Sequence, residues 1–129
     1  MTRRALADTS LFIARESGRP LAQIELPDEL AISVITLGEL RAGVLTAADV
    51  ATRAVRLATL TEALTVDVVE IDQAVAEMWA RLRVMLRNGG FRMPVNDSWI
   101  AATAMALQVP VVTQDDDYVE VSGLSVIRV

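Results

Sequence analysis

The sequence contains no cysteine, no histidine and no lysine among its 129 residues. Without cysteine there is no disulfide framework and no thiolate nucleophile. Without histidine, imidazole bases and the usual zinc sites are excluded. All twelve basic residues are arginine, which excludes a Walker lysine, a Schiff-base lysine and a receiver-domain lysine. Carboxylates, hydroxyls and arginines remain for chemistry, and such oxygen ligands suit hard divalent cations.

Long apolar runs are also missing. No stretch approaches the roughly 18 residues needed to span a bilayer, and the first residues lead into a strand pattern instead of a secretory segment. Hydrophobic residues nevertheless make up 53% of the chain, which excludes disorder. The length suits a single domain over residues 1–129. We therefore expect a soluble, cytoplasmic protein that does not associate with membranes.

Aspartates follow directly on apolar runs near both ends of the chain. Asp8 follows one such run, and residues 115–117, all aspartate, follow another. Crowded carboxylates repel one another and resist desolvation, so a divalent cation is expected to compensate them. Three successive side chains cannot all face one point. Asp116 and Asp117 are therefore interpreted as helix-start or solvent-exposed acids.

The chain alternates between strand and helix patterns. Short apolar or β-branched runs predict five strands, at residues 3–8, 30–33, 65–71, 110–113 and 125–129. Apolar residues at helical spacing predict five helices, at residues 10–16, 34–45, 47–63, 73–88 and 97–107. Strands separated by helices indicate a parallel sheet covered on both faces. The predicted fold class is α/β, a three-layer α/β/α sandwich around a mainly parallel sheet of four to five short strands.

The start of the last predicted helix matters most for the site. Asn96 is expected to cap a helix that begins at Asp97, and Val95 is placed to form a hydrophobic staple with Ile100. A carboxylate in the first turn is favoured by the helix dipole. The position of Asp97 therefore has a structural explanation as well as a functional one.

Four acids from separate segments can meet at one edge of the predicted sheet, because ligands of parallel sheets bind outside the carboxyl ends of the strands. Asp8 closes the first strand, and Asp115 lies two residues beyond Thr113 at the end of the fourth. Asp97 faces the same edge if its helix leads into the fourth strand. Glu39 lies within about two helical turns of the second strand's exit. Taken singly, Asp8 could equally be a helix cap and Glu39 an ordinary surface residue.

Four segments, in this order, carry a resemblance to a known family. They are Asp-Thr-Ser at 8–10, Gly-Glu-Leu at 38–40, Asn-Asp-Ser-Trp-Ile-Ala-Ala at 96–102 and Val-Thr-Gln-Asp-Asp-Asp-Tyr at 112–118. Together they resemble the PIN domain, and in particular the VapC toxins of bacterial VapBC toxin-antitoxin modules. The resemblance covers residues 3–128. Tyr118 stands where the family commonly has phenylalanine.

The resemblance implies a metal-dependent ribonuclease, with Mg²⁺ as cofactor and Mn²⁺ as a possible substitute. The family's four catalytic acids correspond to Asp8, Glu39, Asp97 and Asp115. The metal is expected on Asp8, Asp97 and Asp115, with Glu39 and Asp117 as further possible ligands, and Asp117 competes with Asp115 for the fourth position. Hydroxyls near the metal or phosphate correspond to Thr9, Ser10 and Thr113.

The same resemblance implies partners: an RNA substrate, a second copy in a homodimer, and a small VapB-like antitoxin whose tail enters the acidic groove. The net charge of −5 opposes nonspecific affinity for nucleic acid, which comes from neutralising phosphates. Arginine forks match phosphate geometry, so arginines are expected to provide the contacts. The candidates are Arg15, Arg41, Arg87 and Arg92.

Elementary chemistry agrees with hydrolysis of a phosphodiester, because a carboxylate-bound cation can activate water and neutralise developing charge without histidine or lysine. Two other functions also fit an acidic pocket on a parallel sheet. A signalling receiver that accepts phosphate on aspartate is disfavoured by the missing lysine and by having a single early acid. A non-catalytic metal-binding module is disfavoured by the presence of all four acids.

Overall fold

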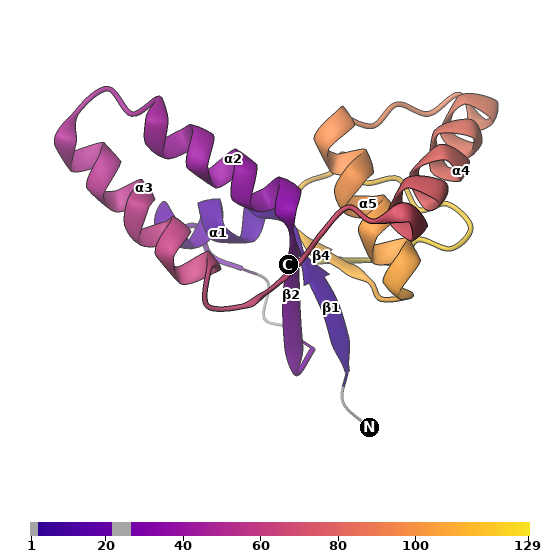
Figure 1. The fold of residues 1–129 in the computed structure, drawn as a ribbon, viewed down its shortest axis with the longest axis horizontal. Coiled ribbons are helices and arrows are strands. Elements are labelled where there is room, and N and C mark those ends of the chain that lie inside the picture. The colour runs from indigo at the N-terminus through magenta and orange to yellow at the C-terminus, as the bar shows by residue number, and fades with distance from the viewer. Residues whose placement is uncertain (1–2, 22–26) are drawn as a thin grey trace.

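The computed structural model describes residues 3–21 and 27–129. The sequence also predicts a loop containing Pro20 and Pro27, and residues 22–26 of that loop lie outside the described residues. Within them, strands and helices form three layers (Figure 1). The strands are β1 (Arg4–Ala7), β2 (Glu29–Ser33), β3 (Asp67–Val69), β4 (Val111–Thr113) and β5 (Val126–Arg128). The helices are α1 (Thr9–Glu16), α2 (Val34–Leu45), α3 (Val50–Ala63), α4 (Gln73–Gly89) and α5 (Val95–Leu107).

The sheet has the strand order β3-β2-β1-β4-β5, and every neighbouring pair is parallel. This order places β1 beside β4, with Leu6 opposite Val111 and Ala7 opposite Val112. Because all strands run in the same direction, their carboxyl ends meet at one edge. The predicted α/β/α sandwich with a parallel sheet is confirmed.

Alternate residues of the central strands pack into two separate cores, because successive side chains in a strand point to opposite faces. Leu6 and Val111 join the core beneath α4 and α5. Ala7 and Val112 join the core beneath α1, α2 and α3. Figure 1 shows these two groups of helices on either side of the strands. Along residues 3–21 and 27–129, no helix is long and apolar enough to cross a membrane.

The starts of α2 and α4 and the end of α4 lie close to where the sequence predicts them. Side-chain caps fix the two starts, and a glycine fixes the end. Ser33 Oγ accepts a hydrogen bond from the Ile35 amide at the start of α2, at 3.0 Å. Asp72 does the same for the Val75 amide of α4, at 2.9 Å. Gly90 ends α4 with a φ of +71°, a left-handed conformation that favours glycine.

The predicted start of α5 is wrong by two residues. The helix begins at Val95, and its N-cap is Pro94, whose carbonyl accepts a hydrogen bond from the Ser98 amide. Pro94 supplies the extended backbone of a cap without any side-chain hydrogen bond, so Asn96 is not the cap. Val95 is largely exposed and is the first residue of the helix. A hydrophobic staple needs a residue before the cap, so the staple predicted for Val95 is wrong. Asp97 still lies in the first turn.

Other boundaries differ where tertiary contacts decide them. The predicted strand at 65–71 is reduced to three residues, because β3 is an edge strand that pairs only with β2. Helix α3 begins after Asp49, whose carboxylate accepts a hydrogen bond from the Thr52 amide. No helix starts at Asp116 or Asp117. Both are exposed in an irregular segment between β4 and β5.

Candidate metal centre

Three carboxylates from three segments meet at the carboxyl edge of the sheet. Asp8 follows β1, Asp115 lies just beyond β4, and Asp97 is in the first turn of α5. One oxygen from each lies within 4.8 Å of the others. Oxygens around one cation lie within about 4–5 Å of each other, twice the usual metal–oxygen distance. The three carboxylates can therefore share a single ion.

Asp8 is the most enclosed of the three, with 1% of its surface exposed. Its Oδ2 accepts hydrogen bonds from the Ser10 amide at 3.2 Å and the Thr113 hydroxyl at 2.9 Å. Its Oδ1 accepts one from the Tyr118 hydroxyl at 2.7 Å. Asp8 is also the N-cap of α1. Asp8 therefore caps α1, as one reading of the sequence predicts, and also belongs to the three-carboxylate group.

Two of the hydroxyls predicted to support the site, those of Ser10 and Thr113, form hydrogen bonds between the segment after β1 and the end of β4. Thr113 uses its single proton toward Asp8, so Ser10 must donate to Thr113 at 3.1 Å. The Asp115 amide donates to the same Thr113 oxygen at 2.9 Å, and the Gln114 amide donates to Ser10 Oγ at 2.9 Å. These bonds fix the backbone that carries Asp115 relative to Asp8.

Glu39 lies beside the three-oxygen group and is not one of its members. Its Oε1 accepts a hydrogen bond of 2.7 Å from Thr9, which in turn accepts one of 2.9 Å from Thr36. Its Oε2 has a long contact of 3.5 Å with Asn96 Nδ2. Its charge reaches Asp97 and helps to raise the pKa of that carboxyl. The structure thus brings all four predicted acids to one edge.

The electrostatics of the cluster oppose full ionisation. Burial, followed by the charges of Asp8, Asp115, Glu39 and Asp117, raises the pKa of Asp97 to about 7. Burial, and then the charges of Asp8 and Asp117, also raises the pKa of Asp115, while Arg19 lowers it. A divalent cation would neutralise the like charges that help to raise the pKa values of Asp97 and Asp115. The donor set fits such an ion.

Tyr118 completes the polar surroundings of Asp8 from the core side. Burial, together with the charges of Asp8 and Asp97, raises the pKa of the Tyr118 hydroxyl well above its ordinary value of 10. The hydroxyl therefore remains a proton donor throughout the working pH range. The sequence marks Tyr118 only as a position where the family commonly has phenylalanine, so its hydrogen bond to Asp8 is a contact that sequence reasoning missed.

The other two acids of the aspartate run differ from Asp115. Asp116 is fully exposed and lies 3.7 Å from Arg128, a pair that contributes little at the surface. Asp117 is exposed too, and it acts on the cluster through its charge. Asp115, which is partly buried and within the three-oxygen group, has the stronger geometric claim to the fourth acidic position.

The predicted arginines are spread over several elements. Arg15 forms an ion pair of 2.5 Å with Glu62 of α3. The remaining three are exposed. Arg41 lies on α2, Arg87 in the last turn of α4 and Arg92 in the segment before α5. Arg19, which follows α1, is the arginine whose charge lowers the pKa of Asp115. Sequence reasoning missed it, because only folding brings it toward β4.

The first turn of α5 is anchored by aromatic residues. The Trp79 indole N–H donates to Ser98 Oγ at 3.0 Å, and Ser98 donates to the Val95 carbonyl at 2.5 Å. The Trp79 and Trp99 rings stack with centroids 4.3 Å apart. These contacts hold α5 against α4 where no side chain caps the helix, and so they fix the turn that carries Asp97.

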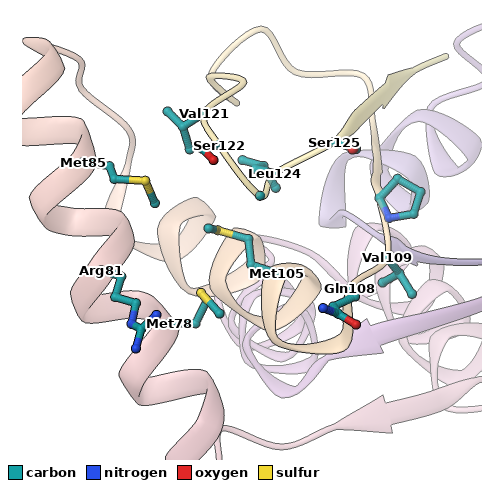
Figure 2. A pocket seen from close by; sticks show the side chains of 12 residues that line it. Met78, Arg81, Met85, Met105, Gln108, Val109, Val121, Ser122, Leu124 and Ser125 are labelled. Carbon is teal, nitrogen blue, oxygen red and sulfur yellow. The ribbon is translucent and has the colours of Figure 1, made fainter.

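Two hollows differ in their chemistry. One of about 630 Å³ opens beside the acids and is lined by Glu39, Asn96 and Gly38 with apolar residues of α2. Another of about 910 Å³ lies at the opposite edge of the sheet, between α4, the end of α5 and the segment before β5 (Figure 2). Met78, Met85 and Met105 point toward it, and its lining includes no carboxylate. The larger hollow therefore offers no carboxylate to a cation, whereas the smaller one contains Glu39, one of the four predicted acids.

A parallel α/β/α fold with carboxylates gathered at its carboxyl edge defines a class of proteins with an acidic cation site. Comparison with known sequences and structures identifies the family within this class. The chain belongs to the PIN domain family, which it matches over residues 5–124.

Relatives with assigned names support that placement. The chain is 48% identical to Ribonuclease VapC5 of Mycobacterium tuberculosis, over 95% of this chain and 90% of the relative. It is 46% identical to Ribonuclease VapC4 of the same organism, over 98% of both chains. The crystal structure of VapBC-5, a member of the VapBC family of toxin-antitoxin systems from M. tuberculosis, contains a chain with a TM-score of 0.90 and 43% identity, covering 98% of each chain.

Proposed function

We propose that this protein is a Mg²⁺-dependent endoribonuclease toxin of a type II toxin-antitoxin system, acting as a single domain in the cytoplasm. The observation that carries the proposal is the group of three carboxylate oxygens within 4.8 Å, one each from Asp8, Asp97 and Asp115. The names of the VapC5 and VapC4 relatives support RNA as the substrate class. The similarity to the VapBC-5 chain supports a partner antitoxin.

The residues of the site divide into ligands and supports. Asp8, Asp97 and Asp115 would hold Mg²⁺, or Mn²⁺ in its place, with Glu39 and Asp117 contributing charge nearby. A bound divalent cation would supply an activated water, neutralise charge developing on the phosphate and stabilise the leaving oxygen. The hydroxyls of Ser10 and Thr113 keep Asp8 and Asp115 in register, and Thr9 orients Glu39.

Arginines are the proposed contacts to the RNA backbone. Arg19 is added to the predicted set because its charge reaches Asp115 at the acidic edge. Arg15 is already paired with Glu62, so it is the weakest of the set unless RNA displaces that carboxylate. The other proposed contacts are Arg41, Arg87 and Arg92, all exposed. Guanidinium groups match phosphate oxygens in pairs, which suits this role.

A VapB-like antitoxin and a second copy of the chain are the proposed protein partners. An antitoxin tail that enters the acidic groove would block the approach of RNA to Asp97 and Glu39. Large apolar side chains remain exposed on α2 and α3, which supports contact with another protein. They include Leu45, Val50, Val55 and Leu57.

The proposal is tested by incubating purified, metal-free protein with total RNA and mapping the new RNA ends after Mg²⁺ is added. Defined new ends that require Mg²⁺, and that disappear with EDTA, are expected. Equal cleavage with EDTA would contradict a metal-dependent nuclease. Absence of cleavage together with labelling of an aspartate by acetyl phosphate would indicate a phospho-accepting module instead.

A further inference from the structure

Tyr118 links the hydrophobic core to the acid cluster. The residue follows three aspartates in an irregular segment, yet it has 1% of its surface exposed. Its ring belongs to the core beneath α4 and α5, together with Leu6 and Val111. Its hydroxyl leaves that core and donates to Asp8 Oδ1 at 2.7 Å. A buried ring thus holds a donor against the most buried carboxylate of the site.

The backbone of Tyr118 is held independently of its hydroxyl. Arg128 of β5 donates from Nη2 to the Tyr118 carbonyl at 2.8 Å. The same guanidinium lies 3.7 Å from Asp116. Since β5 pairs with β4 in the sheet, this contact ties the position of Tyr118 to the sheet itself.

The hydrogen bonds of Asp8 leave one electron pair of its carboxylate oxygens without a donor. Each carboxylate oxygen accepts about two hydrogen bonds in the carboxylate plane. Oδ2 is filled by the Ser10 amide and the Thr113 hydroxyl. Oδ1 has one donor, Tyr118, and so retains one free electron pair. The Asp115 carboxyl can share a hydrogen bond with Asp8 only while one of the two is protonated. When both are ionised to bind a cation, Tyr118 is the donor among the described contacts that holds Oδ1 in place.

We propose that Tyr118 is a positioning residue for cation binding, whose hydroxyl fixes Asp8 so that its one unused electron pair is presented to the ion at Oδ1. The inference rests on the proposed function only in requiring a divalent cation at the acid cluster. It does not require that RNA be cut. Donors that orient metal ligands contribute about 10–100-fold to metal affinity in other proteins.

Tyr118→Phe removes the hydroxyl and keeps the buried ring. We expect Mn²⁺ and Mg²⁺ to bind about 10–100-fold more weakly to this variant, measured by calorimetric titration of metal-free protein. In an RNA cleavage assay, the Mg²⁺ concentration for half-maximal rate should rise by a similar factor. The rate at saturating Mg²⁺ should stay close to that of the wild type, because the ligands themselves are unchanged.

Thr59→Val is the matched control. Thr59 is also buried, and its hydroxyl donates to a carboxylate oxygen of Glu16 at 2.7 Å, away from the acid cluster. This variant should lose stability, as Tyr118→Phe does, without a change in metal affinity. Wild-type metal affinity in folded Tyr118→Phe, or an equal loss in both variants, would overturn the proposal.

A second variant covers the case in which Tyr118→Phe fails to fold. Arg128→Leu leaves the hydroxyl in place and removes the anchor of the Tyr118 backbone, so a several-fold loss of Mn²⁺ affinity is expected. Unchanged affinity would then count against the proposal. A wild-type protein that binds no Mn²⁺ would contradict both proposals. One that binds Mn²⁺ but cuts no RNA would contradict the proposed function alone.

Discussion

At the scale of single residues, the aspartates at the carboxyl edge differ in burial and therefore in what they can do. Asp8 is enclosed and fully hydrogen-bonded at one oxygen, whereas Asp97 and Asp115 are partly open. Asp117 adds charge from the surface. A cation held by the first three would be shielded on the Asp8 side and accessible on the other, where a phosphate can approach.

Asp115→Asn and Asp117→Asn separate the two candidates for the fourth acid. Asp115 belongs to the three-oxygen group, so its substitution should weaken Mn²⁺ binding by at least about 10-fold. Asp117 is exposed and screened by solvent, so its substitution should change affinity by less than about 3-fold. Calorimetry on the metal-free variants measures both. The reverse order would assign the position to Asp117.

The sequence predicts the acids of the site better than their supports. Asp8 and Asp115 could be located because each follows a strand, and parallel strands end at one edge. The Tyr118 hydroxyl could not, since its partner Asp8 is 110 residues away and only the packed core brings them together. Arg19 was missed for the same reason.

At the scale of secondary structure, local signals decide helix ends and tertiary contacts decide strand lengths. The caps at Ser33 and Asp72 need only neighbouring residues. Edge strand β3 is shorter than its β-branched run, because its length is set by pairing with β2. Helix α5 begins at Val95 because Pro94 takes the cap position. The sequence favours Asn96 as the cap, because asparagine is a preferred cap residue and proline is not.

Two glycines, one at the end of α4 and one within α2, should respond to alanine substitution with opposite changes in stability. Gly90 has a φ of +71°, so Gly90→Ala should lower the free energy of unfolding by about 1–2 kcal/mol. Gly38 lies within α2, and an added Cβ there would meet nothing within 4 Å. Gly38→Ala should raise the free energy of unfolding by about 0.5–1 kcal/mol. Urea denaturation measures both, and changes of the same sign would contradict the assigned backbone conformations.

At the scale of the whole molecule, the acid cluster couples folding stability to pH. The pKa of Asp97 is raised from 3.8 to about 7 by folding, and that of Asp115 is also raised. Between pH 4 and 7 the metal-free folded protein therefore binds more protons than the unfolded chain. Its stability should fall as pH rises through this window.

Thermal denaturation with and without Mg²⁺ tests this coupling. In metal-free protein the melting temperature should fall between pH 5 and pH 7.5, and Mg²⁺ should reduce that fall because it offsets the like charges. Asp97→Asn should flatten the metal-free profile. A melting temperature that rises over this range, in the wild type but not in the variant, would contradict the raised pKa of Asp97.

The central claim is that Asp8, Asp97 and Asp115 hold a divalent cation with which the protein cuts RNA. The most direct measurement is the rate of cleavage of a defined RNA by wild-type protein and by folded Asp97→Asn, each supplied with Mg²⁺. The wild type should cut the RNA, and the variant should be slower by about 100-fold or more, since charge stabilisation at the reacting phosphate is lost. Equal rates in the two proteins would contradict the assignment of the site.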